Sequence, residues 1–366
     1  MNLAPEVPAP PFCPNPDCRF HRRDRHLWRF VRVGFYLRMT APFRVQRYRC
    51  DTCRRKFGDQ TFSTTYWMKR PDLLVPVFHR LVGCSGFRQI ASEFGVSPQT
   101  IGRVSGRLGR HALLFHQLNR PKGPIQEPLA RDSFESFEYS QYYPTSYHVA
   151  AGQRTHFFYG FTDSECRRRG HMTRAQKKRR VQLEERLGKP DPRSIEKEVA
   201  ALLAMLAPAP QALELHTDRH TSYPRAVLRV PHLSIAHFTI SSRAARTSRN
   251  PLFAINLIDL KLRHNGANHK RETIAYSKRR ASAAYRMAQF LVWRNWVRPF
   301  SERRGGPSPA MRLGITDQRL SVPDLLNERL FPSRVTLPER WQSYYRKEIQ
   351  TRAIPRGTKH RLKYAA

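Results

Sequence analysis

Residues 129–139 read LARDSFESFEY, and this stretch decides the fold class of the second half of the chain. Apolar and polar residues alternate along it, which is the period of a β-strand with one buried face. Asp132 shares that face with the apolar residues two positions away on either side. Two further strand-like runs follow, residues 146–152 (SYHVAAG) and 155–162 (THFFYGFT). Three sequential strands at hairpin spacing predict an antiparallel meander.

Helices and two more strands are predicted beyond this meander. Residues 165–206 form a long helical stretch that opens with two basic clusters, CRRRGHM and QKKRR, which are either a solvated helix face or a clamp on a nucleic-acid backbone. Residues 212–218 (ALELHTD) predict a fourth strand with Asp218 at its end, and residues 233–240 (LSIAHFTI) predict a fifth. A short turn and helix lie between these two strands.

A third acid follows on the helix predicted over residues 251–264. Asn256, Asp259 and Arg263 are spaced so that they share one face of that helix. Glu272 is the alternative third acid, but it follows a predicted break at HNGAN. Asp259 is favoured because helical phase places it with Asn256 and because it follows the fifth strand at the shorter distance.

The predicted order of strands and helices is close to that of the ribonuclease-H-like architecture. There, an acid on the first strand, one on the fourth strand and one on a late helix meet at one edge of the sheet. Asp132, Asp218 and Asp259 occupy those three places. Carboxylate oxygens suit hard divalent cations, so we expect two Mg²⁺ or Mn²⁺ ions at this site.

Charge predicts a nucleic-acid partner. The chain of 366 residues has 66 Lys plus Arg against 28 Asp plus Glu, a net charge of +38. Such an excess favours phosphate binding through counterion release, although a highly soluble ribosome-like surface would share it. No apolar run is long enough to span a bilayer and no secretory signal is evident, so we expect no membrane partner. The six cysteines are no disulfide framework in a chain of this size, and a reducing, cytoplasmic compartment fits them best.

The first part of the chain predicts a zinc ribbon. Cys13 and Cys18 form a C-x4-C pair, and Cys50 and Cys53 form a C-x2-C pair, with strand-like runs between the pairs. Zinc takes four thiolates in tetrahedral geometry, and two close pairs on tight turns supply them. One structural Zn²⁺ is therefore expected, with chance pairing of free thiols as the alternative.

A helix-turn-helix is predicted over residues 87–108 (FRQIASEFGVSPQTIGRVSGRL). Gly95 permits a tight turn, Ser97 is a helix N-cap, and Pro98 suits the first helical position. We expect the second helix to contact DNA through the residues it leaves outward: Gln99, Arg103, Arg107 and Arg110. The alternative is a plain helical hairpin that packs on the next domain.

These segments together resemble the DDE transposases of bacterial insertion sequences that carry an N-terminal zinc ribbon and helix-turn-helix. The resemblance covers nearly all of residues 13–300 and rests on CPNPDC, YRCDTCRRKF, LARDSFESFEY, LHTDRHTSYP, NLIDLKLR, RETIAYSKR and the helix-turn-helix. The predicted fold class is multidomain α+β and α/β. The expected domains are a zinc ribbon (1–66), a helix-turn-helix region (67–120), a ribonuclease-H-like catalytic domain (121–300, with a helical insertion at 164–207) and a basic C-terminal extension (301–366).

The resemblance implies binding of transposon ends and target as double-stranded DNA, by a homodimer or higher oligomer, in a prokaryotic, cytoplasmic and nucleoid-associated setting. It also implies metal-dependent phosphodiester hydrolysis and strand transfer. Asn256, Arg263 and His216 are candidate accessory residues, with ordinary packing roles as the alternative. The family name implies a glutamate as third acid, whereas this chain offers Asp259. A non-catalytic regulator derived from a transposase, or a ribonuclease-H-like nuclease, would share parts of the same sequence pattern.

Overall fold

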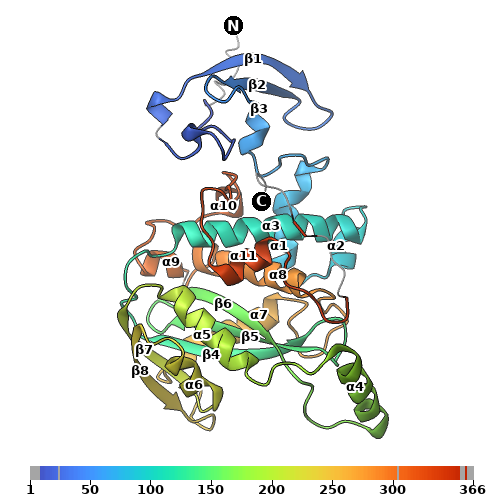
Figure 1. The fold of residues 1–366 in the computed structure, drawn as a ribbon, viewed down its shortest axis with the longest axis vertical. Coiled ribbons are helices and arrows are strands. Elements are labelled where there is room, and N and C mark those ends of the chain that lie inside the picture. The colour runs from blue at the N-terminus through green and yellow to red at the C-terminus, as the bar shows by residue number, and fades with distance from the viewer. Residues whose placement is uncertain (1–8, 24, 303–304, 355–358, 361–366) are drawn as a thin grey trace.

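The chain folds into three stacked parts, and the computed structural model describes residues 9–23, 25–302, 305–354 and 359–360 of it (Figure 1). A small three-stranded sheet lies at one end, a layer of helices lies in the middle, and a five-stranded sheet flanked by helices lies at the other end. The predicted mixed α+β fold is therefore confirmed. None of the helices in the described part of the chain has both the length and the apolar character that a membrane span requires.

The large sheet has the strand order β6-β5-β4-β7-β8. Its strands are β4 (Leu129–Phe137), β5 (Pro144–Gly152), β6 (Phe158–Glu165), β7 (Gln211–Asp218) and β8 (Leu233–Ile240). The first three form the predicted antiparallel meander. Strand β7 then pairs in parallel with β4, and β8 pairs in parallel with β7. The sheet is mixed, and β4 lies at its centre.

Helices cover both faces of this sheet. They are α4 (Arg174–Leu187), α5 (Ser194–Leu206), α6 (Ser222–Leu228), α7 (Phe253–Asn265) and α8 (Arg280–Val292), which continues into a π-helical turn, Trp293–Val297. Helix α4 lies at the periphery, and Leu183 is its one buried residue (Figure 1). The single helical stretch predicted over 165–206 is wrong in detail. It is divided because Gly188, at φ +77°, ends α4 and two prolines follow.

The N-terminal half contributes the small sheet and part of the helical layer. Its elements are β1 (Phe30–Leu37), β2 (Arg44–Cys50), β3 (Lys56–Gly58), α1 (Leu74–Val82), α2 (Phe87–Glu93) and α3 (Pro98–Asn119). Ser97 caps α3 by accepting a hydrogen bond from the Thr100 N–H at 3.2 Å, as the sequence predicts. Helix α3 runs for 22 residues, so it extends well past the predicted helix-turn-helix.

Glycine lets α3 approach α8 closely. A Cβ built on Gly109 would lie 2.2 Å from the Cβ of Tyr285, so no other residue fits at that position without movement. Gly106 faces the ring of the same tyrosine at 3.7 Å. The glycines that lower the intrinsic helix propensity of α3 are thus explained by packing.

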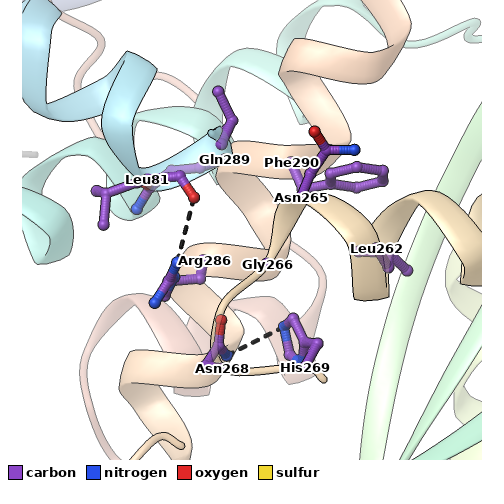
Figure 2. Close-up of a pocket in the computed structure, with 10 residues that line it drawn as sticks. Leu81, Leu262, Asn265, Gly266, Asn268, His269, Arg286, Gln289 and Phe290 are labelled. Carbon is purple, nitrogen blue, oxygen red and sulfur yellow. Dashed lines mark hydrogen bonds between the residues drawn. The ribbon is translucent and has the colours of Figure 1, made fainter. Parts of the chain in front are cut away.

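The helix-turn-helix region is docked on the second half of the chain (Figure 2). Arg286 of α8 donates to the Leu81 carbonyl at 3.1 Å and to the Ser85 carbonyl at 3.2 Å. The Cys84 N–H donates to the Asn265 carbonyl at 2.9 Å, which joins the end of α1 to the end of α7. The cavity between these helices measures about 10 Å³, which leaves room for about one water molecule.

The C-terminal segment is an integral part of the fold. It contains three short helices, α9 (Pro309–Arg312), α10 (Val322–Leu325) and α11 (Glu339–Tyr345). The Trp341 indole donates to the Phe161 carbonyl of β6 at 2.9 Å, and Arg329 donates to the Thr61 carbonyl below the ribbon at 2.6 Å. Residues 305–354 therefore pack against both ends of the molecule and are no simple basic extension. Most of the predicted basic tail, GTKHRLKYAA, lies outside the described residues.

Candidate functional site

Four cysteines converge at one end of the small sheet. The Sγ atoms of Cys13 and Cys53 lie 3.6 Å apart, and those of Cys18 and Cys50 lie 3.9 Å apart. All four sulfur atoms lie within 4.8 Å of one another. Thiolates bound tetrahedrally to one zinc ion at about 2.3 Å would be about 3.8 Å apart. The spacing therefore fits a zinc ion, and the site is a mostly buried four-cysteine group that could hold one.

Neighbouring groups orient these sulfur atoms. The Trp28 indole N–H donates to Cys50 Sγ at 3.2 Å, and the rings of Trp28 and Tyr48 each stack on Phe57. Burial alone would raise the pKa of the Cys50 thiol, but hydrogen bonds from the Cys53 backbone N–H and from the indole lower that pKa to about 7. Donors aimed at a sulfur atom stabilise its thiolate form, which is the form that binds metal.

Parallel pairing of β4 with β7 aligns the first two predicted acids. Ala130 pairs with His216, and Asp132 and Asp218 each lie two residues further along their strands. Alternate residues share a face of a sheet, so both carboxylates project from the same face. Burial and then repulsion from Asp218 raise the pKa of Asp132, although the Ser133 N–H and the Arg131 charge oppose this.

The third predicted acid approaches the same face from α7, which packs over β4 and β5. Asp259 Oδ1 is buried and has no hydrogen-bond partner in the described structure. Burial and then repulsion from Asp132 raise the pKa of Asp259 well above its ordinary value. Glu272 is exposed in the loop after α7. The fold thus sets Asp259 against Asp132 and leaves the rival acid at the surface.

The three aspartates are neighbours, but their carboxylate oxygens do not converge on a single point. Among the described residues, only the four cysteines form a group of three or more His, Cys, Asp or Glu side chains whose ligand atoms all lie within 4.8 Å of one another. The donor set nevertheless fits divalent cations, because all its ligand atoms are hard carboxylate oxygens and one of them is buried without a partner. Binding a shared ion requires the carboxylates to approach one another.

A buried arginine on the opposite face of β4 was missed by the sequence argument. Arg131 is fully buried, and its Nη2 lies 2.5 Å from Ser133 Oγ and 2.9 Å from His148 Nδ1. Its Nε and Nη1 have no hydrogen-bond partner within the described structure, and its guanidinium lies 4.0 Å from the centre of the Tyr223 ring. The Arg131 charge lowers the pKa of both Asp132 and Asp259. Alternation in LARD places Arg131 on the face opposite to Ala130 and Asp132 and predicts exposure, so the sequence carried no signal of its burial.

The accessory residues are engaged within the protein. Arg263 donates to the carbonyls of His269 at 3.0 Å and Glu135 at 3.3 Å, and its charge lowers the pKa of Asp259. The His216 ring lies 2.7 Å from the Glu214 carboxylate and stacks on Phe238. These contacts fit the ordinary packing role that the sequence left open for this residue. Asn256 is partly buried on α7.

The predicted DNA-contacting side chains of α3 divide into two groups. Gln99 and Arg103 are exposed on its first turns. Arg107 donates to the Thr64 carbonyl at 2.9 Å, and Arg110 is buried with its guanidinium 5.7 Å from the ring centre of Tyr285. The prediction that these two arginines face outward is therefore wrong, because the second half of α3 is enclosed by α8 and α11.

Comparison with known proteins adds little to this geometry. No family model matches the chain, and no curated protein matches it. One similar solved structure is a chain from the cryoEM structure of a simian T-cell lymphotropic virus intasome in complex with PP2A regulatory subunit B56 gamma. The two chains are 12% identical, the match covers 68% of this chain and 76% of that one, and the TM-score is 0.28. A likeness at this level carries no argument about function.

Proposed function

We propose that this protein is a DDE-type transposase that uses three aspartates. It would bind transposon ends in double-stranded DNA and catalyse phosphodiester hydrolysis and strand transfer, as a homodimer or higher oligomer on the prokaryotic nucleoid. The observation that carries the proposal is the meeting of Asp132, Asp218 and Asp259 at one face of a mixed sheet in a chain of net charge +38.

The three carboxylates would hold two divalent cations between them. When bound, such ions activate the attacking oxygen and stabilise the leaving one in an in-line displacement. Asp132 and Asp218 are fixed at adjacent strand positions, whereas Asp259 comes from a separate helix. Its raised pKa means that cation binding displaces a proton, so metal affinity should increase with pH.

In the reaction, water would first attack phosphorus and the 3′-oxygen of the transposon end would leave. That 3′-hydroxyl would then attack a phosphodiester of the target. Each step forms one P–O bond and breaks another, and no covalent enzyme intermediate is needed.

DNA contact would come from exposed positive charge. Gln99 and Arg103 lie on the exposed first turns of α3, where base edges or phosphates could be reached. Helix α4 carries a second group of exposed cations that includes Lys177, Lys178 and Arg179. Phosphate contacts of this kind fix the position of the duplex on the protein and make binding sensitive to salt.

Cleavage of a plasmid that carries the transposon ends tests the assignment. Asp218→Ala should abolish Mg²⁺-dependent nicking while leaving DNA binding intact, because the residue lies at the carboxylate site and away from the exposed turns of α3. Glu272→Gln is the matched control and should cleave like the wild type. If Asp218→Ala nicks the plasmid as fast as the wild type does, these carboxylates take no part in the reaction.

The three carboxylates do not gather their oxygens within 4.8 Å of one another in the described structure, and this favours one alternative, a non-catalytic DNA-binding regulator derived from a transposase. Calorimetric titration with Mn²⁺ separates the two functions. A catalytic protein should bind Mn²⁺ at this site and lose that binding in Asp218→Ala, whereas a regulator would bind DNA equally well with and without the ion.

A further inference from the structure

A groove of about 270 Å³ lies between the zinc ribbon and the segment that leads to α1. Small-molecule sites in proteins are of similar or larger volume, about 300–1,000 Å³. The groove is far along the chain from the aspartates, and the proposed reaction does not use it. Tyr36, Tyr66 and Trp67 contribute aromatic surface to its walls, and Arg47 and Lys56 contribute positive charge.

Two of these aromatic side chains present their rings to solvent. Trp67 is 82% exposed and Tyr36 is 40% exposed. Trp67 also adopts a φ of +59°, which bulky residues rarely do, and a strained backbone of this kind is often found at binding sites. Its neighbour Tyr66 is anchored by the buried guanidinium of Arg329, 4.4 Å from the ring centre. A large aromatic group that is exposed in this way is typical of a binding surface.

Gly58 keeps the floor of the groove open. A Cβ at this position would lie 3.0 Å from the Gln46 carbonyl oxygen and 3.7 Å from the Tyr36 ring. Any larger side chain would therefore crowd the aromatic wall. The missing side chain lets β3 lie close to β2 and to the ring of Tyr36 at the base of the groove.

The charge of the groove selects an anionic ligand. Three of the described residues that line it are cationic and none is acidic. Cations alone would suit any phosphate, and aromatic rings alone would suit any apolar group. The combination of rings with cations is the one that binds single-stranded nucleic acid, because bases stack on the rings while phosphates lie against the cations.

We propose that this groove binds an unpaired nucleotide of single-stranded DNA. Tyr36 and Trp67 would stack on the base, and Arg47 and Lys56 would contact the adjacent phosphates. The inference rests on the proposed function for the origin of the strand, since hydrolysis at a transposon end frees a strand terminus that can then unpair from its complement. A base inside a duplex is already stacked on its neighbours, so duplex DNA should gain nothing from the two rings.

Fluorescence anisotropy with labelled oligonucleotides tests the groove on the full zinc-loaded chain, without added Mg²⁺. The probes are an oligothymidylate of about 12 nucleotides, an abasic strand of equal length and a blunt duplex. Stacking on aromatic side chains should give the wild type a roughly tenfold preference for oligothymidylate over the abasic strand. Comparison of the two single strands cancels the non-specific attraction of the basic chain.

Substitutions then assign the preference to the groove. Trp67→Ala and Tyr36→Ala should remove it without changing duplex affinity, and Trp67→Phe should retain it. Lys56→Gln should weaken both single strands alike. Phe43→Ala is the matched control, because Phe43 is 65% exposed on the same ribbon and does not line the groove. Equal wild-type affinity for the two single strands, or an unchanged preference in Trp67→Ala, would overturn the proposal.

Failure of this inference can be told from failure of the proposed function. If the preference is present and Mg²⁺-dependent cleavage is absent, the groove binds single-stranded DNA but the transposase assignment is wrong. If cleavage is present and the preference is absent, only the groove is wrong.

Discussion

Asp259 carries a buried carboxyl oxygen, Oδ1, that has no hydrogen-bond partner in the described structure, and this has a measurable effect on stability. Its pKa is raised by burial and by Asp132, so the folded protein retains a proton that the unfolded chain releases near pH 4. The stability that this proton provides is complete below pH 4 and is lost as pH rises through the folded pKa. Above that pH the buried negative charge destabilises the fold, because burial and repulsion from Asp132 outweigh the attraction of Arg263 and Arg131.

Asp259→Asn should therefore stabilise the metal-free protein at pH 8 by roughly 2 kcal/mol, although it abolishes cleavage. Thermal unfolding at pH 5 and pH 8 without Mg²⁺ measures this, and the advantage of the variant should be larger at pH 8. Glu272→Gln, at an exposed site, should change neither melting temperature. If the wild type and Asp259→Asn have the same melting temperature at both pH values, Asp259 does not carry a buried charge.

Arg131 is expected to act through its charge on the neighbouring carboxylates. It lies on the face of β4 opposite to Asp132, and its guanidinium lowers the pKa of Asp132 and Asp259. Without it, both acids should hold their protons to higher pH and compete less well for Mg²⁺. We classify it as a positioning residue, because it is fully buried and acts through the carboxylates.

Arg131→Gln should shift the pH profile of cleavage to higher pH and raise the Mg²⁺ concentration needed for half-maximal rate. Arg131→Lys should restore part of both, since it keeps the charge without the planar donors. A purely structural role would lower the rate at every pH by the same factor and leave the profile in place.

At the scale of elements, the contact of α3 with α8 depends on missing side chains. Gly109→Ala should destabilise the protein by about 1–3 kcal/mol, because the new Cβ would meet Tyr285 at 2.2 Å. Gly102→Ala is the matched control, since its Cβ would meet only the Phe87 ring at 3.5 Å. That variant should gain up to about 1 kcal/mol from helix propensity. Urea denaturation of both variants compares the two effects, and equal free energies of unfolding would contradict the packing argument.

The same helix shows what the sequence could and could not predict. Ile101, Val104 and Leu108 recur at helical spacing in the sequence, which predicts one apolar face, and all three are buried in the structure. It could not show that Arg110, on the other face, would be covered by α8 and the C-terminal segment, because that burial comes from residues far away in sequence. Apolar periodicity shows which face of a helix or strand is apolar, whereas contacts with distant segments decide whether its other faces are also buried.

The strands were easier to predict than their surroundings. Alternation of apolar and polar residues placed Asp132 and Asp218 at positions that the parallel register of β4 and β7 then aligned. Arg131 escaped the same reasoning because a strand arginine is ordinarily exposed. Its burial depends on Tyr223 and His148, which come from other elements of the sheet domain.

At the scale of the whole molecule, buried carboxyl groups join the large sheet to the C-terminal segment. Asp163 of β6 is fully buried and contacts Arg280 of α8, together with Arg340 and Tyr344 of α11. Glu138 lies beside this cluster and accepts a hydrogen bond from the Thr351 hydroxyl at 3.2 Å. Helix α8 and the C-terminal segment are thus held to the sheet through ionisable side chains.

Glu138 should make the stability of the whole protein depend on pH. Burial, and then repulsion from Asp163 and Glu165, raise its pKa to about 8, against the opposing charge of Arg280. The stability from its bound proton is complete below about pH 4, the ordinary range of a glutamate, and is lost as pH rises through 8.

Glu138→Gln keeps the neutral shape at every pH, so its free energy of unfolding should match the wild type at pH 5 and exceed it by about 1–3 kcal/mol at pH 9. Glu135→Gln, an exposed change on β4, should follow the wild type throughout. Parallel curves for wild type and Glu138→Gln in urea denaturation from pH 5 to pH 9 would show that Glu138 is ionised in the folded protein at neutral pH, and that the junction between sheet and C-terminal segment tolerates its charge.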